Sequence, residues 1–218
     1  MDLLNFNKVS GKSRGEFLKL IALVTMAIDH IGFNYSSDSV MRVIGRISLP
    51  IFCYLLVQGY LHTSSFKKYA SRLFVFSIIS QIPFTYYFGK NELNIFMTLF
   101  IALLALYAFE KRFWVLFFSL LVTSVAVPMD YGIYVVFLVM IFYAFEKGFV
   151  GQNAFLISFF LGTLGATLLS FWPVQMFAIL SPFLIYLTPN INYRIKIPKY
   201  AYYAFYPAHL ILLSFIFK

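Results

Sequence analysis

Residues 17–34 read FLKLIALVTMAIDHIGFN, an apolar run of helix length that carries Lys19 near its start and the pair Asp29–His30 near its end. A helix of this length spans most of a bilayer, whereas an ionised side chain in mid-span costs roughly 2.5–3.5 kcal/mol on insertion scales. Charged residues in such runs therefore usually have a functional reason to be there. The run predicts a membrane-spanning helix with a chemically important outer end.

The spacing within this run places two basic side chains on one face. Lys19 and His30 are eleven residues apart, close to a whole number of helical turns, so they project the same way about 16 Å apart along the axis. The simpler alternative is that Lys19 reaches lipid headgroups and that His30 is a hydrogen-bonded packing residue. The spacing does not choose between these two readings.

The composition indicates an integral membrane protein whose first partner is the lipid bilayer. With 61% hydrophobic and only 11% charged residues, the chain lacks the polar surface that a soluble globule of 218 residues needs. The net charge of +9 lies in short gaps between apolar runs, which is typical of topology signals and argues against nucleic acid. Cys53 is the single cysteine, so a disulfide framework and a thiolate metal cluster are both excluded.

The chain predicts an all-α fold, a polytopic helical bundle of about nine transmembrane helices. Backbone groups in hydrocarbon must be satisfied within the segment, and no alternating barrel pattern is present. No gap is long enough to separate domains, so residues 1–218 form one predicted domain. Several runs are short for a full span. The predicted helices are 17–34, 40–60, 69–88, 94–109, 113–128, 131–145, 153–170, 172–187 and 201–217.

The distribution of Lys and Arg predicts a cytoplasmic N-terminus in a multi-pass membrane protein. With the N-terminus inside, only Lys90 and Lys218 lie outside, and Arg42 and Arg46 lie within the second span. The remaining thirteen basic residues are then cytoplasmic: Lys8, Lys12, Arg14, Lys19, Lys67, Lys68, Arg72, Lys111, Arg112, Lys147, Arg194, Lys196 and Lys199.

Threaded in this way, the polar residues of five spans fall in the outer half. Arg42 and Arg46 are four residues apart and share a face, and two buried guanidiniums need an anion, for which Asp29 is the nearest acidic residue within the predicted spans. His209 lies in the middle of the last span. A functional cavity and a purely structural polar network are both compatible with this pattern, and the ionisable groups favour the cavity. The other residues at this depth are His30, Gln81, Pro83, Asn94, Thr98 and Asp130.

The inner end carries a second polar group, His62, Thr63, Lys67, Lys68 and Arg72. Basic residues of this density suit anionic lipid headgroups and topology, and the phosphates of a polyanionic cofactor would use the same side chains. His62 is as compatible with a structural role as with a ligand contact.

No Walker loop, GxGxxG, GxSxG or HExxH motif occurs, so nucleotide hydrolysis, nicotinamide chemistry and zinc proteolysis have no support. No two of the three histidines lie four residues apart, and no metal is expected. An imidazole titrates near neutrality, which makes a histidine the best general base here. Adjacent helical residues point about 100° apart, so Asp29 either fixes the tautomer of His30 or serves the arginines.

Several segments, in this order along the chain, resemble the TraX family. They are LKLIALVTMAIDHIG (18–32), MRVIGRISLPIFCYLLVQGYLHT (41–63), KKYASRLFVFSIISQIPF (67–84), LNIFMTL (93–99), MDYG (129–132) and YAFYPAHL (203–210). The first and last are also similar to the membrane acyltransferase-3 superfamily, in which a basic residue, ten intervening residues and a histidine open the fold. Lys19 and His30 match that pattern, and His209 matches the closing histidine.

The resemblance implies an acetyltransferase, because the founding type of the family N-acetylates a pilin subunit. Acetyl or a similar acyl group would pass from cytoplasmic acetyl-coenzyme A to an amine or hydroxyl of a protein N-terminus, a glycan or a small molecule. Together with the geometry described above, it gives the hypothesis that His30, Asp29, Arg42, Arg46 and His209 are catalytic. Lys19, His62, Thr63, Lys67, Lys68 and Arg72 would hold the donor.

Two other classes of protein remain open. A secondary transporter or channel would use the buried Asp, Arg and His groups as an ion relay, and it predicts inverted repeats with interrupted helices in matching halves. The chain shows no such symmetry. A structural or assembly factor would use the same residues to hold helices together.

Overall fold

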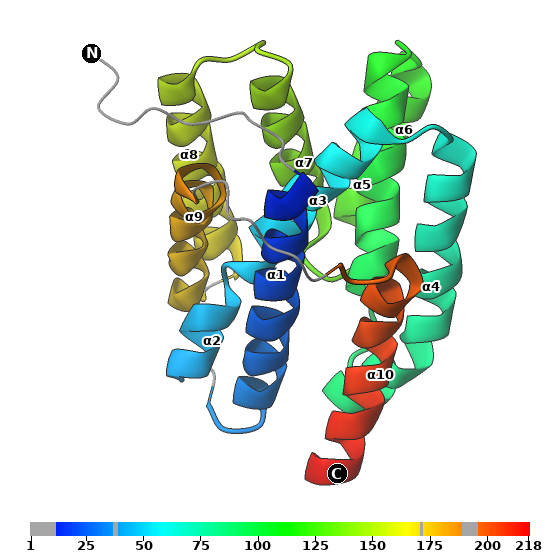
Figure 1. Ribbon diagram of the computed structural model, residues 1–218, viewed down its shortest axis with the longest axis vertical. Coiled ribbons are helices and arrows are strands. Elements are labelled where there is room, and N and C mark those ends of the chain that lie inside the picture. Colours follow the sequence, from blue (N-terminus) through cyan, green and yellow to red (C-terminus); the bar gives the residue numbers. More distant parts are fainter. Residues whose placement is uncertain (1–11, 37–38, 171, 189–195) are drawn as a thin grey trace. The chain divides into compact units, whose positions relative to one another are not determined.

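Helices make up most of the computed structural model, which describes residues 12–36, 39–170, 172–188 and 196–218, with side chains from Gly15 onward (Figure 1). The predicted all-α class is confirmed for these residues. The chain divides into two compact units, which are Met1–Leu55 with Ile141–Lys199 (unit 1) and Leu56–Met140 with Tyr200–Lys218 (unit 2). The prediction of a single domain stays a prediction.

Each unit is a set of packed helices. Unit 1 contains α1 (Lys12–Phe33), α2 (Val40–Gly45), the start of α3 (Ser48–His62), the end of α7 (Gly132–Glu146), α8 (Gln152–Ser170), the 3₁₀ helix η1 (Pro173–Leu180) and α9 (Ser181–Leu187). Unit 2 contains the remainder of α3 and α7 together with α4 (Phe66–Phe88), α5 (Ile95–Glu110), α6 (Trp114–Ala126) and α10 (Lys199–Phe217) from Tyr200 onward.

Two predicted helices differ from the structure, and proline accounts for both differences. The run 40–60 is interrupted at Arg46 and Ile47, because Pro50 has no N–H to donate to the carbonyl of Arg46 four residues earlier. The run 172–187 begins at Pro173 as η1 and becomes α-helical only at Ser181, where Pro182 follows. Both changes lie in unit 1 and shape the site described below.

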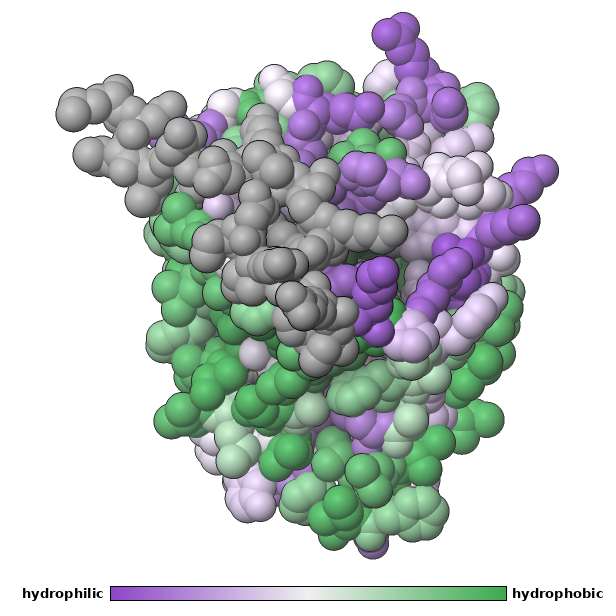
Figure 2. All heavy atoms as spheres, in the orientation of Figure 1, coloured by the Kyte–Doolittle hydropathy of each residue, from purple (hydrophilic) through white to green (hydrophobic). Residues whose placement is uncertain are grey.

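Three helical segments of the described chain are long and apolar enough to span a membrane: Val40–His62, Gln152–Ser170 and Lys199–Phe217. Four shorter apolar segments are Ile95–Glu110, Trp114–Ala126, Gly132–Glu146 and Pro173–Leu187. Apolar residues, drawn in green, occupy much of the face shown in Figure 2. Large apolar side chains such as Ile82, Val115 and Phe215 are exposed. The nine-span topology goes beyond these observations. Lys8 and Arg194, which enter the orientation count, lie outside the described residues.

Two helices end in almost the same heptapeptide, YAFEKRF (107–113) and YAFEKGF (143–149). In both, the sixth residue has a positive φ, 58° at Arg112 and 76° at Gly148, and the N–H of the final Phe donates to the carbonyl of the Ala at 2.8 Å. This is the Schellman arrangement that closes a helix C-terminus. The two glutamates then accept from tyrosine hydroxyls, Glu110 from Tyr60 and Glu146 from Tyr186. Sequence reasoning missed this repeat, which fixes one helix end in each unit.

Aromatic side chains fill the interior of unit 1. Phe145 stacks on Phe155 with ring centroids 4.5 Å apart and meets Tyr186 edge-on at 5.1 Å. Tyr186 in turn meets Tyr54 of α3 at 5.7 Å, so α3, α7, α8 and α9 share one core.

Candidate functional site

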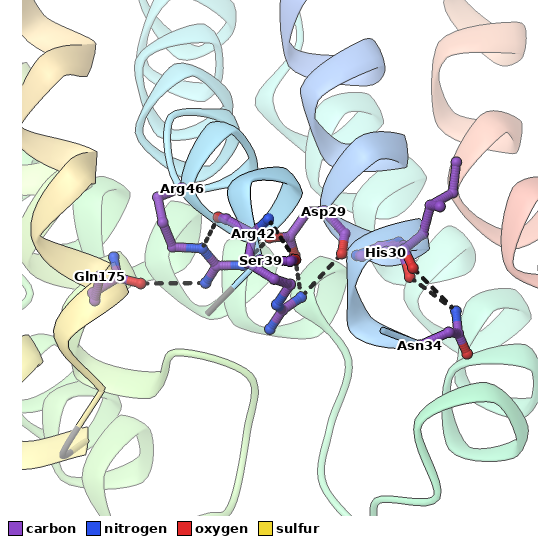
Figure 3. Close-up of polar contacts among 8 residues, drawn as sticks. Asp29, His30, Asn34, Ser39, Arg42, Arg46 and Gln175 are labelled. Carbon is purple, nitrogen blue, oxygen red and sulfur yellow. Dashed lines mark hydrogen bonds and ion pairs between the residues drawn. The ribbon is translucent and has the colours of Figure 1, made fainter. Parts of the chain in front are cut away.

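The ionised residues of the first two helices meet in unit 1 (Figure 3). Asp29 Oδ2 accepts from Arg42 Nη1 at 2.6 Å, and Asp29 Oδ1 accepts from Arg46 Nη2. All three residues are buried, with exposed fractions of 6%, 8% and 2%. The pairing predicted from the four-residue spacing of the arginines is therefore present. Asp29 also has its backbone carbonyl 3.2 Å from Arg42 Nη1, which fixes that guanidinium against the last turns of α1.

Glycine allows this close approach of α1 and α2. A Cβ at Gly45 would lie 2.2 Å from both the Cβ and Oδ1 of Asp29, and one at Gly32 would lie 2.7 Å from the Cβ of Met41. Small residues at helix interfaces are a common means of close packing in membranes. Ser39 caps α2 by accepting from the N–H of Arg42 at 3.4 Å. The small residues and the cap thus bring the Asp29 carboxylate into contact with both Arg42 and Arg46.

A second element, η1, completes the surroundings of Arg46. Its Nη1 donates to Gln175 Oε1 at 3.3 Å, and its Nε donates to the carbonyl of Arg42 at 3.2 Å, so Arg46 lies between Asp29 and Gln175 in Figure 3. The ring of Trp172 lies over both guanidiniums, with its centroid 4.4 Å from Arg46 Cζ and 4.6 Å from Arg42 Cζ. Sequence reasoning missed Gln175 and Trp172. A Gln beside a Trp-Pro pair in an apolar run was the available signal.

His30 follows Asp29 on α1 and is only partly buried. Its carbonyl accepts from Asn34 Nδ2 at 3.3 Å (Figure 3). The sequence left two roles open for Asp29, fixing the tautomer of His30 or pairing with the arginines. In the structure its carboxylate accepts from both guanidiniums, so it pairs with the arginines. The carboxylate of Asp29 is thus occupied by the arginines, and His30 is its neighbour in sequence near the end of α1.

The N-terminal half of α1, which the sequence places at the inner end, carries an ion pair that the sequence did not suggest. Lys19 Nζ donates to Glu16 Oε1 at 2.8 Å, and Glu16 Oε2 accepts from the N–H of Ile197 at 3.0 Å. Glu16 therefore ties the start of α1 to the segment that precedes α10. A phosphate bound by Lys19 would have to compete with this carboxylate.

Unit 2 holds the other predicted site residues. His209 is 8% exposed, stacks on Phe205 with centroids 4.9 Å apart, and has Nδ1 2.8 Å from the carbonyl of Phe205. A carbonyl oxygen can only accept, so Nδ1 carries the proton and Nε2 is the basic nitrogen. His62 has the same arrangement with the carbonyl of Gln58, also at 2.8 Å, but is exposed.

The basic residues that the sequence places at the inner end, Lys67, Lys68 and Arg72, lie in the first two turns of α4. Ser65 caps this helix, and Thr63 Oγ1 both accepts from the N–H of Ser65 and donates to its carbonyl, which gives Thr63 a structural part. Lys67 and Lys68 are exposed, and Arg72 Cζ lies 5.6 Å from the ring centroid of Tyr69. Cations in a first helical turn oppose the helix dipole, so an anion at this helix start would be favourable.

A neutral network joins the polar residues predicted near the outer level of unit 2. Asn94 Nδ2 donates to Gln81 Oε1 at 2.8 Å and to the carbonyl of Ser77 at 2.6 Å, and Thr98 Oγ1 donates to the carbonyl of Asp130 at 2.9 Å. These bonds join α4, α5 and the start of α7. This network fits the structural alternative better than a catalytic site, because the side-chain N–H and O–H donors of Asn94 and Thr98 all have an amide or backbone carbonyl oxygen as acceptor.

The family model described as TraX protein matches residues 14–217. A probable fimbrial assembly protein FimC of Dichelobacter nodosus, serogroup H1, is 28% identical over 236 aligned residues, covering 90% of this chain and 92% of that protein, so the likeness extends over nearly all of both. An uncharacterized protein of Rickettsia prowazekii is 31% identical over 48% of this chain and 41% of that protein. No solved structure matches.

Proposed function

The chain belongs to the TraX family, and from this membership and the buried charges of unit 1 we propose that it is a membrane-embedded acyltransferase. Its donor is cytoplasmic acetyl-coenzyme A, or a similar acyl-coenzyme A, and its acceptor is an amine or hydroxyl reached at the membrane or its outer side. The FimC relative is named for fimbrial assembly, so the first acceptor to test is a subunit of a surface fibre.

The observation that carries this proposal is the burial of Asp29, Arg42 and Arg46 at the end of α1 that also carries His30. Buried ion pairs contribute little stability compared with apolar side chains of similar volume, because desolvation offsets most of the Coulomb attraction. Charges kept buried where α1 and α2 meet, at the helix end that carries an imidazole, therefore indicate a use beyond packing. General base catalysis with electrostatic stabilisation of an oxyanion needs this combination of groups.

In the proposed reaction, His30 accepts the proton of the acceptor amine or hydroxyl as its nitrogen or oxygen adds to the thioester carbonyl carbon. The carbonyl oxygen gains negative charge, which the guanidiniums of Arg42 and Arg46 stabilise. The C–S bond then breaks, and the leaving sulfur of coenzyme A takes the proton from His30. Asp29 holds both arginines in position through the reaction and is a positioning residue.

The donor enters from the inner side in this proposal. Lys19 lies on the same face of α1 as His30, about 16 Å away along the helix. Its ammonium, which is paired with Glu16 in the structure, would exchange that carboxylate for a phosphate of coenzyme A. The residues predicted from the sequence to hold the donor in unit 2 are candidates for phosphate binding by their residue types alone: His62, Thr63, Lys67, Lys68 and Arg72. His209 is the alternative base, through Nε2.

The membrane arrangement proposed with this function has nine spans and a cytoplasmic N-terminus, in the bacterial inner membrane. It rests on the cytoplasmic excess of thirteen basic residues over two. Four apolar helical segments shorter than 18 residues would then require local thinning of the bilayer or tilt of their neighbours.

Radiolabelled acetyl-coenzyme A provides the test. Membranes that contain the protein are incubated with the labelled donor, and thioester consumption and acylated products are measured, the latter by mass spectrometry. We expect consumption with the wild-type chain and none with His30→Ala, normalised to folded protein. Equal consumption by membranes with and without the protein would refute the proposal and leave the transporter and assembly-factor alternatives.

A further inference from the structure

Two buried N–H donors beside the arginines have no hydrogen-bond partner within the part of the chain that the structure describes: Gln175 Nε2 and Trp172 Nε1. Gln175 is 3% exposed. Its Oε1 accepts from Arg46, so the orientation of the amide is fixed, because the reverse orientation would point its NH₂ group at a guanidinium. A buried donor without an acceptor costs free energy and calls for an explanation.

The two donors come from one turn and belong to side chains that contact the same pair of arginines. Trp172 and Gln175 are three residues apart at the start of η1, a helix with three residues per turn, so their side chains lie on one side. The N–H of Gln175 donates to the carbonyl of Trp172 at 3.1 Å, which closes that turn. The indole ring covers both guanidiniums, and the amide meets Arg46.

The chemistry of this cluster selects its ligand. An amide N–H and an indole N–H accept nothing and can only donate, and the neighbouring guanidiniums repel cations. An oxygen that bears negative charge satisfies both donors and is attracted by Arg42 and Arg46. We propose that Gln175 and Trp172, with Arg46 behind them, form an oxyanion-binding site that takes one anionic oxygen group of the substrate.

Two sources supply that chemistry. One is a carboxylate of the acceptor, bound before the reaction. The other, which rests on the proposed acyl transfer, is the thioester carbonyl oxygen. It becomes negative as the nucleophile adds to the carbon and loses that charge as the C–S bond breaks and the sulfur leaves with the electron pair. In that case the two neutral donors contact the oxygen, and the arginines act as the charge behind them.

A binding experiment tests the site without relying on any activity. The chain has two tryptophans, so Trp114→Phe leaves Trp172 as the single fluorophore, and Trp114 is a half-exposed residue of the other unit. Sodium acetate is titrated against sodium chloride at constant ionic strength. Gln175→Glu keeps an oxygen for Arg46 while removing the donor and adding repulsion. Gln58→Glu is the matched control, because Gln58 Nε2 is another buried amide donor without a partner in the described chain.

Single-turnover acyl transfer with Trp172→Phe, which keeps a ring over the arginines, separates the two sources. A carboxylate ligand predicts saturable acetate binding that weakens at least tenfold in Gln175→Glu, and a higher acceptor Kd in Trp172→Phe. A transition-state oxyanion predicts a transfer rate about 10²–10³-fold lower in Trp172→Phe with unchanged affinity for acetyl-coenzyme A.

The outcomes also separate this inference from the proposed function. Saturable, Gln175-dependent acetate binding by a chain that transfers no acyl group would support the site and refute acyl transfer. The inference is overturned if acetate leaves the emission of Trp172 unchanged and Trp172→Phe and Gln175→Glu both transfer at the rate of Gln58→Glu. It is equally overturned if neither acetate binding nor wild-type transfer is found.

Discussion

Gly45→Ala tests whether the contact between α1 and α2 holds the buried charges together. The added methyl carbon would lie 2.2 Å from Asp29 Cβ, where ordinary contacts begin at 3.4 Å. Asp29 Cβ is bonded to the backbone of α1, so no side-chain rotation relieves this overlap. The two helices must separate by more than 1 Å, or the carboxylate must leave its partners.

The expected cost follows from these two routes. Inserting a methyl group into a packed interface costs about 1–3 kcal/mol. Breaking a buried ion pair by displacing one partner costs about 3–5 kcal/mol. The Arg42 contact, now 2.6 Å, would lengthen past hydrogen-bonding range with a shift of that size, so we expect a loss near the upper end, about 3 kcal/mol in the free energy of unfolding.

Reversible unfolding in detergent micelles measures this loss, and Gly165→Ala is its control. Gly165 lies within α8, and nothing would lie within 4 Å of its added Cβ. Alanine in a helix interior is favoured over glycine by about 0.5–1 kcal/mol, so the control should match or exceed the wild type. If Gly45→Ala is as stable as Gly165→Ala, the close approach of α2 to Asp29 is wrong.

Three other changes have definite outcomes. Asp29→Asn keeps the shape of the side chain but removes the charge that pairs with both arginines, so unfolding should require about 3–5 kcal/mol less; an unchanged denaturation midpoint would contradict the buried network. Arg46→Lys should lose acyl transfer in folded protein, because one ammonium cannot reach Asp29, Gln175 and the Arg42 carbonyl together. Full transfer by this variant would show that the reaction does not need a planar guanidinium at this position. Glu16→Gln should raise coenzyme A affinity several-fold by releasing Lys19 while the amide oxygen keeps the Ile197 bond, and equal affinity would exclude Lys19 from phosphate binding.

Topology has its own test in cysteine labelling. Cysteines at Ser37, which lies outside the described residues, and at the exposed Lys199 should react with impermeant reagents from opposite sides of the membrane. Labelling of both positions from one side would refute the nine-span arrangement with a cytoplasmic N-terminus.

Features that depend on local chain order could be predicted from the sequence. The helical runs were predictable because apolar stretches, prolines and capping residues act within a few residues. The pairing of Asp29 with Arg42 and Arg46 was predictable because the arginines share a helix face and Asp29 is the single acidic residue within the runs 17–34 and 40–60. The break before α3 was missed, although Pro50 signalled it.

Features that depend on distant segments were not predictable. Gln175 reaches Arg46 across 129 positions of the sequence, and Ile197 reaches Glu16 across 181. A glutamine in an apolar run gives no indication of its partner, because an amide forms hydrogen bonds with nearly any polar group. Only the folded structure shows that Gln175 Oε1 accepts a hydrogen bond from the Arg46 guanidinium and that Gln175 Nε2 is buried.

The two heptapeptides show how one local signal can be used in different surroundings. Each predicts its own helix end, and each glutamate accepts from a tyrosine, yet Tyr60 precedes its partner in the chain whereas Tyr186 follows its partner. The motif therefore specifies a carboxylate at a closed helix end and leaves the identity of the hydroxyl donor to the fold. Carboxylates at helix C-termini are disfavoured by the dipole, so a tyrosine hydrogen bond to each glutamate offsets a cost that occurs in both heptapeptides.

Glu16 is likewise held by hydrogen-bond donors, because it accepts from Lys19 and from the N–H of Ile197. Three of the carboxylates are thus held by fixed donors, and the buried Asp29 differs from them in holding two guanidiniums at once, which is the property that a charge-stabilising site requires.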